Sequence, residues 1–85
     1  MTIEYIEWED SQAVATGWHY MEDLDFELPV MKSIGWVVKE DPTFVVLSAN
    51  IGEETPTSRL QGNGIMLIPK RCIVKRFTMA LAAED

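Results

Sequence analysis

The feature that most constrains the fold is the alternation of side chains over residues 30–38. Successive side chains of a β-strand point to opposite faces of a sheet, so a period of two predicts a strand. Asp41 and Pro42 follow, and proline favours the bend of a turn. Residues 44–51 are mostly apolar on both faces, which predicts a central strand covered on two sides. Together these stretches predict a β-hairpin in the middle of the chain.

Apolar stretches outside the hairpin predict three more strands. Residues 3–8 alternate apolar with acidic residues apart from one slip at Tyr5 and Ile6, which indicates a half-buried strand with a bulge. Residues 65–68 predict a short buried strand. Residues 72–79 predict a last strand, in which Ile73 and Phe77 face inward.

The remaining segments are predicted to be connections. Residues 52–64 form a polar loop that ends in Gly-Asn-Gly, and a tight turn follows at residues 69–71. Residues 11–20 fit neither a helix nor a strand. Residues 21–28 are a short helical turn or an extended segment, which Pro29 ends in either case.

A chain of 85 residues has room for one core, so we predict a single domain over residues 1–85. It divides into an acidic segment with the first strand (residues 1–29), a meander (residues 30–79) and a tail that frays (residues 80–85). Because Cys72 is the one cysteine, no internal disulfide forms, and a reducing compartment is expected. Without a basic and apolar start, or a stretch long enough to span a bilayer, the expected location is the cytoplasm of a bacterial host cell and no membrane partner is expected.

The net charge of −7 is distributed unevenly. No lysine or arginine occurs in residues 1–31, whereas residues 55–83 hold only basic charged side chains, namely Arg59, Lys70, Arg71, Lys75 and Arg76. We expect the acidic segment to lie beside the basic end strand, in the same chain or in a neighbouring subunit. The alternative is a basic patch of Lys70, Arg71, Lys75 and Arg76 for nucleic acid, which the acidic net charge disfavours.

The chain lacks the usual combinations of catalytic or metal-binding residues. His19 is the one histidine, and with Cys72 as the other soft ligand it is too little for a zinc site. The acidic cluster of residues 22–27 lacks the central glycine and the closing glutamate of an EF-hand loop. Cys72, in an apolar stretch, is expected to be a buried thiol. We therefore predict no catalytic residue, no metal and no cofactor.

Three tryptophans are many for this length. Trp36 alternates within a predicted strand and is expected in the core. Trp18 lies between His19 and Tyr20 in the irregular stretch, and exposed aromatic side chains commonly anchor binding partners. Trp18, His19 and Tyr20 are therefore the candidate partner-binding residues, with completion of the core as the alternative role of Trp18.

The order of the predicted strands resembles that of small SH3-like barrels, including the Sm-like branch. The resemblance rests on Ser33-Ile34-Gly35-Trp36-Val37-Val38, the turn at Asp41, Val45-Val46-Leu47, Ile65 to Ile68 and Cys72-Ile73-Val74. The long loop at residues 52–64 and the lack of a histidine-bearing signature depart from the bacterial Sm-like RNA chaperones, so no RNA-binding residue is carried over. The resemblance implies a five-stranded barrel or a strongly curved antiparallel sheet, with room for one short helical turn.

Several short motifs are similar to those of small uncharacterised proteins of bacteriophages and prophages. They are Trp8-Glu9-Asp10, Gly17-Trp18, Ile34-Gly35-Trp36-Val37-Val38, Val45-Val46-Leu47 and Ile68-Pro69-Lys70. We expect a non-enzymatic accessory module that binds a protein partner or assembles with itself into a homo-oligomer. The alternatives are an Sm-like nucleic-acid binder, and a small-ligand-binding protein or enzyme whose pocket is shared between subunits.

Overall fold

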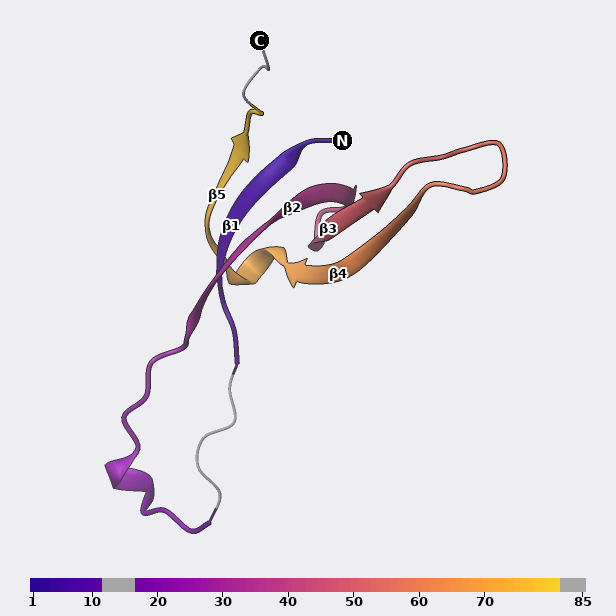
Figure 1. Ribbon diagram of the computed structural model, residues 1–85. Coiled ribbons are helices and arrows are strands. Elements are labelled where there is room, and N and C mark those ends of the chain that lie inside the picture. Colours follow the sequence, from indigo (N-terminus) through magenta and orange to yellow (C-terminus); the bar gives the residue numbers. More distant parts are fainter. Residues whose placement is uncertain (12–16, 82–85) are drawn as a thin grey trace.

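The computed structural model describes residues 1–11 and 17–81 as a five-stranded antiparallel sheet with two short 3-10 helices (Figure 1). Along the chain the elements are β1 (Ile3–Glu9), η1 (Met21–Asp23), β2 (Val30–Glu40), β3 (Phe44–Gly52), β4 (Gln61–Pro69), η2 (Lys70–Cys72) and β5 (Ile73–Met79). In the sheet the strands lie in the order β4-β3-β2-β1-β5. The prediction of a mainly β protein with five strands is confirmed, and residues 82–85 of the predicted tail lie outside the described residues.

The predicted hairpin forms between β2 and β3, and Asp41 fixes its turn. The Asp41 carboxylate accepts hydrogen bonds from the backbone N–H of Thr43 at 2.7 Å and of Phe44 at 3.0 Å, and from the Thr43 hydroxyl at 2.7 Å. The Thr43 hydroxyl, with help from the two N–H groups, lowers the pKa of Asp41. Asp side chains commonly bond backbone groups two residues on, so this turn is specified locally.

The bulge predicted in β1 is absent from that strand, because the extra residue, Val74, lies in the paired strand β5. The strand pairs without interruption with β2, from Ile3 opposite Trp36 to Glu9 opposite Val30. On its other side, against β5, the register shifts between Glu7 and Trp8. The slip in the sequence pattern therefore arises because Tyr5 and Ile6 are apolar side chains on opposite faces of β1, and not because a residue is inserted there.

The connection from β3 to β4 is shorter than predicted, because β4 begins at Gln61 and not at Ile65. Gly64 adopts a φ of 72° inside the strand, a conformation that residues with side chains rarely take. The predicted short buried strand over residues 65–68 is wrong in both respects. The strand has nine residues, and only Ile68 is buried. β4 is an edge strand, so no neighbouring strand covers its outer side.

The core is small and lies on one face of the sheet, here called the inner face. Side chains that lie directly opposite on paired strands share a face. The buried hydrophobic side chains of the described residues are Ile6, Val45, Leu47 and Ile68, with Trp8, Val37 and Ile73 packed against them. In β3, Val45 and Leu47 are buried on the inner face and Ser48 is buried on the other, whereas Ala49 and Asn50 are exposed. The prediction that both faces of this strand are covered therefore holds only for its first part.

Two side chains expected in the core lie on the opposite, outer face. Phe77 is 46% exposed, and Trp36 is only half-buried. Both follow from register, because Phe77 lies opposite Tyr5 and Trp36 lies opposite Ile3, and neither β1 residue belongs to the inner face. Ile73 does pack against the core, as predicted.

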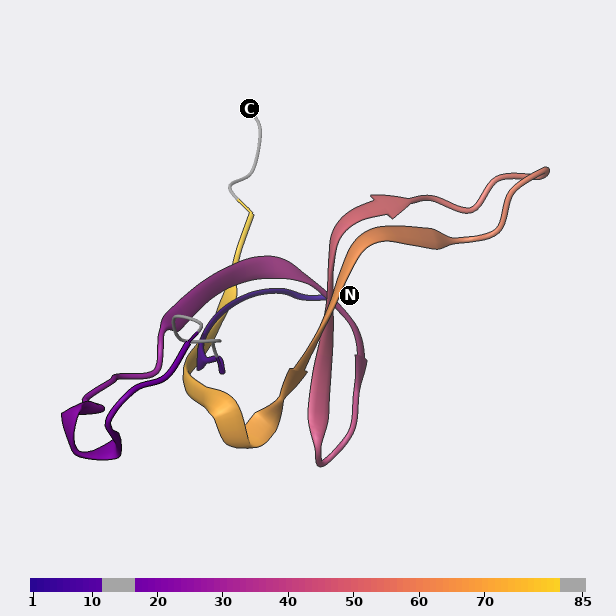
Figure 2. The same ribbon diagram turned by 90° about the horizontal axis from the view of Figure 1, so that it is seen from below.

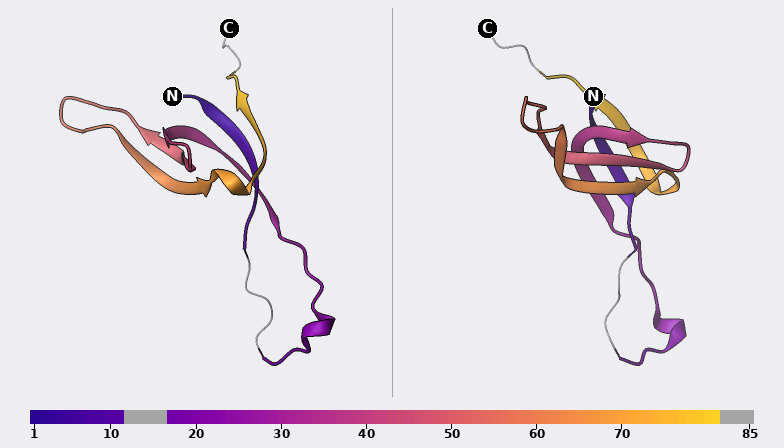
Figure 3. Two further views of the ribbon diagram at one scale, coloured as in Figure 1. Left: turned by 180° about the vertical axis from the view of Figure 1, so that it is seen from behind. Right: turned by 90° about the vertical axis from the view of Figure 1, so that its right-hand side faces the viewer.

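The sheet stays open, so the prediction of a closed SH3-like (Sm-like) barrel is wrong, and so is its alternative, a strongly curved antiparallel sheet. β4 and β5 are the two edge strands, and no ladder joins them within the described residues. The three residues of η2 connect these edges, and the sheet curves around its inner face (Figure 3). Closure of a barrel requires the first and last strands to pair.

The molecule is elongated. Its extents are 60 × 29 × 28 Å and its radius of gyration is 17.6 Å, whereas a compact domain of this length has about 12 Å. Residues 17–28 extend away from the sheet on one side, and the β3–β4 hairpin extends on another (Figure 2). The shape leaves much of the chain in contact with solvent.

Candidate functional site

The connection between β1 and β2 extends from the sheet as an arm, a name used here for residues 17–28. At its base, the Asp10 backbone N–H donates to the Pro29 carbonyl at 3.0 Å. η1 forms a single turn, in which Leu24 N–H donates to the Met21 carbonyl at 3.2 Å. The open choice between a helical turn and an extended segment over residues 21–28 thus resolves to one turn followed by extended chain. Every residue of the arm is exposed.

The arm carries large apolar side chains and carboxylates in alternation. Its exposed hydrophobic side chains are Trp18, Tyr20, Met21, Leu24, Phe26 and Leu28. Its carboxylates are Glu22, Asp23, Asp25 and Glu27, and it contains no lysine or arginine. Monomeric proteins rarely expose large contiguous apolar patches, and such patches commonly mark interaction sites.

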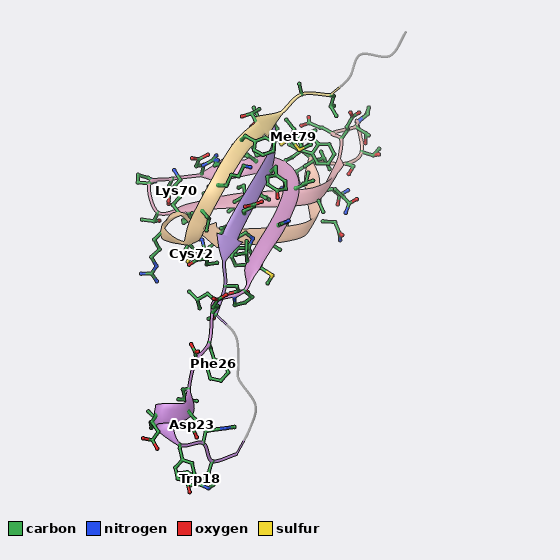
Figure 4. The ribbon with its side chains drawn as sticks, turned by 90° about the vertical axis from the view of Figure 1, so that its left-hand side faces the viewer. Trp18, Asp23, Phe26, Lys70, Cys72 and Met79 are labelled. Atoms are coloured by element: carbon green, nitrogen blue, oxygen red, sulfur yellow. The ribbon has the colours of Figure 1, made fainter. Side chains whose placement is uncertain are left out.

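The three candidate partner-binding residues all lie on the arm. Trp18 is fully exposed, and Tyr20 and His19 are exposed beside it. Trp18 therefore does not complete the core of this chain. Trp18 and His19 border a shallow hollow that is also lined by Met21, Leu24 and Phe26. Figure 4 shows Trp18 and Phe26 on the arm, away from the strands.

A second apolar surface covers the outer face of β2, β1 and β5, and is called here the outer platform. Register places its side chains in two rows across the three strands, with Ile34, Tyr5 and Phe77 in one row and Trp36, Ile3 and Met79 in the next. The Tyr5 and Phe77 rings stack with centroids 4.9 Å apart. Ile34 is 57% exposed, so the platform is open to solvent.

A charged row borders the outer platform on the side nearer the arm. Lys32 and Lys75 lie opposite Glu7 from the two neighbouring strands. The Tyr5 hydroxyl donates to the Glu7 carboxylate at 2.6 Å, and this bond raises the pKa of Tyr5. The Lys75 ammonium lies 5.8 Å from the centre of the Phe77 ring, within the range of a cation–π contact. Neither lysine forms an ion pair within residues 1–11 and 17–81.

The four basic residues predicted as a patch are not gathered on one surface. Arg76 lies on the inner face, where its Nε and Nη2 donate to the Glu4 carboxylate at 2.7 and 2.6 Å. The same guanidinium donates to Glu40 at 3.0 and 2.6 Å, and Lys70 pairs with Glu40 at 2.7 Å. Lys75 lies on the outer face, and Arg71 is exposed in η2.

The ion pairs of Arg76 have an electrostatic consequence. Hydrogen bonds from Arg76 first, and from Lys70 second, lower the pKa of Glu40 to about 2. Glu4 and Glu40 in turn raise the pKa of the Arg76 guanidinium. The expectation that the acidic front lies beside the basic end strand of the same chain is confirmed for Glu4 and Arg76. Two of the four cations of the predicted patch are thereby neutralised.

The remaining sequence features concern the cysteine, metal binding and membrane spanning. Cys72 is a free thiol, half-buried in η2 and not in the last strand. Among the described residues no group of three or more His, Cys, Asp or Glu side chains is arranged to hold a metal ion. Within the same residues no helix has the length and apolar character needed to cross a membrane.

Sequence reasoning missed the outer platform. Its signal was present, because Ile3 and Tyr5 on one stretch and Ile34 and Trp36 on another occupy the positions between core-facing residues. Only the register shows that the two stretches share a face with Phe77. Comparison of the chain with protein-family models, curated proteins and solved structures finds no match.

Proposed function

We propose that this protein is a non-enzymatic interaction module whose working state is a homo-oligomer. The observation that carries this proposal is the excess of exposed surface, which includes many large hydrophobic side chains. The chain of 9.7 kDa exposes 7164 Å², whereas a compact monomer of that mass exposes about 5,100 Å². A stable interface takes about 800 Å² from each partner, so the excess is sufficient for more than one.

The small core supports the same proposal. Four hydrophobic side chains are buried among the described residues, and eighteen large hydrophobic ones are exposed there. Small domains without disulfides or a metal commonly obtain the missing stability by oligomerisation. The resemblance of several short motifs to phage and prophage proteins favours an accessory protein in the cytoplasm of a bacterial host. The return of β5 to pair with β1 supports the resemblance in strand order to SH3-like folds.

The alternatives rest on weaker support. An Sm-like nucleic-acid binder would use Lys70, Arg71, Lys75 and Arg76, but Lys70 and Arg76 are tied to carboxylates. Its affinity for nucleic acid would fall steeply with salt, because the lysine and arginine side chains release the counterions that are condensed on the nucleic acid. A ligand-binding protein or enzyme with a shared pocket predicts stabilisation of the oligomer in a metabolite thermal-shift screen.

Native mass spectrometry of the purified chain tests the proposal, since it reports the number of subunits and any retained ligand together. We expect a defined oligomer without nucleic acid, and analytical ultracentrifugation should show its dissociation on dilution. A monomer at all concentrations up to the millimolar range would contradict the proposal.

A further inference from the structure

We propose that the arm of one copy of this chain docks on the outer platform of a second copy. This inference rests on the proposed self-assembly and names the two surfaces that make the contact. Because the two surfaces differ, copies either exchange arms reciprocally in a two-fold dimer or dock head to tail into a ring.

The arm and the outer platform are complementary in shape and polarity. Leu24 is extended, and over residues 24–28 apolar side chains alternate with the carboxylates of Asp25 and Glu27. Leu24 and Phe26 line the same hollow, and the alternation places an apolar side opposite an acidic one wherever the segment lies extended on a sheet. The platform offers two apolar rows on a sheet face, a surface that accepts an extended segment with an apolar side. Phe26 on the arm and Phe77 on the platform are both about half exposed, and aromatic side chains of this kind are frequent anchors of interfaces.

The arm is acidic, and two of the three charged side chains in the row that borders the platform are lysines, with Glu7 between them. None of the four carboxylates of the arm has an ion pair among the described residues. Lys32 and Lys75, at the border of the platform, are equally without one, and the Lys75 ammonium lies 5.8 Å from the centre of the Phe77 ring in the first apolar row. Opposite potentials of this kind steer association and fix register.

Each chain leaves its own outer platform uncovered. The arm lies beyond the Glu9 end of β1, whereas the row that contains Ile3 lies at the other end. Figure 4 places Trp18 and Phe26 at one end of the molecule and Met79 at the opposite end. A second copy supplies the arm without any rearrangement of the sheet, and the excess surface of roughly 2,000 Å² exceeds what one interface of standard size buries.

Photo-crosslinking of the full chain tests the contact directly. Phe26 is replaced by p-benzoylphenylalanine in unlabelled protein, which is mixed with uniformly 15N-labelled wild-type protein and irradiated. We expect crosslinked peptides that join the unlabelled arm to 15N-labelled peptides from the platform strands β1, β2 or β5. The control carries the photoreactive residue at Glu54, exposed in the β3–β4 connection, and should give no such link.

A matched pair of substitutions measures the contribution of the platform. Ile34→Asp places a charge in the row beside Tyr5, whereas Val74→Asp places it on an equally exposed side chain that lies in neither row, since the two residues are 57% and 58% exposed. We expect Ile34→Asp to raise the dissociation constant of the oligomer at least about tenfold, because an unpaired charge would be buried. Val74→Asp should leave it unchanged.

The outcomes separate this inference from the proposed function. Links from the arm to its own unlabelled chain, or to 15N-labelled β4 peptides, would overturn the docking while leaving self-assembly in place. An oligomer in which Ile34→Asp and Val74→Asp behave alike would do the same. A protein that is monomeric by native mass spectrometry would overturn both.

Discussion

At the residue scale, Arg76 is the side chain on which the polar part of the fold depends most. It holds the Glu4 carboxylate, 6% exposed, in a two-pronged hydrogen bond. Planar pairs of this type are the strongest ion pairs in proteins, but their removal on one side leaves the other charge buried without compensation. Breaking the pair is therefore expected to lower the free energy of unfolding by more than the intact pair contributes to it.

We expect Arg76→Met to lower the free energy of unfolding by about 3 kcal/mol or more, because Glu4 would be left as an unpaired buried carboxylate. Urea denaturation at pH 7 and at one fixed protein concentration measures the change. Replacing Glu4 by leucine as well should recover most of the loss. Arg71→Met serves as the control, since Arg71 is exposed and forms no ion pair among the described residues. Equal effects of the two arginine substitutions would refute the assignment.

Glu40 predicts how stability responds to acid. Its pKa in the folded chain is about 2, against 4.5 for the ordinary group. A carboxyl group with a lowered pKa stabilises the fold above its unfolded pKa, and this contribution is lost as the pH falls towards the folded value. We expect the urea concentration at the midpoint of unfolding to decrease as the pH is lowered from 4.5 to 2. The decrease should be smaller in Glu40→Gln.

Asp41 titrates in an overlapping range, because its pKa is also lowered. Asp41→Asn is therefore measured alongside Glu40→Gln, so that the two carboxyl groups are separated. Identical pH profiles of Glu40→Gln and the wild type would show that Arg76 and Lys70 do not stabilise the ionised form of Glu40.

At the element scale, the arm and the sheet are structurally separable. Glu9 pairs with Val30, and the Asp10–Pro29 hydrogen bond closes the ladder beyond them. The strands of this hairpin are thus held by their own pairing and by the core, and no residue of the arm is buried.

Replacing residues 11–28 by Asn-Gly should leave the sheet folded. A two-residue loop of this type favours the turn that antiparallel strands need, so β1 and β2 would be joined directly. Far-UV circular dichroism and amide NMR shifts of β3 and β4 test the result, with unchanged shifts expected there. A disordered or collapsed product would mean that the arm is required for folding, contrary to its position in the structure.

The elements were predictable to different degrees for physical reasons. The strands and the Asp41 turn were found because alternation and Asx bonding are local properties of the sequence. The open sheet was not predicted, because whether β4 and β5 pair depends on both edges of the sheet at once. For a related reason, the outer platform was missed and the exposure of Trp18 was left open. An apolar residue contributes to the hydrophobic pattern of the sequence in the same way whether it is buried by its own chain or by another one.

At the scale of the whole molecule, the chain combines few buried side chains with a large apolar surface. Any partner that binds the folded state adds to its stability by mass action. Under the proposed self-assembly, the thermal midpoint would therefore report assembly as well as folding.

We expect the thermal midpoint to rise by roughly 3 to 6 °C for each tenfold increase in protein concentration, as two chains that unfold and separate together would require. Differential scanning fluorimetry from micromolar to millimolar concentration measures the slope. Ile34→Asp should give a lower midpoint with little dependence on concentration, because its outer platform no longer accepts an arm. Val74→Asp should keep the wild-type slope. A wild-type midpoint that stays constant over the whole range would mean that the small core suffices by itself, and the exposed apolar surface would then have to serve a different protein.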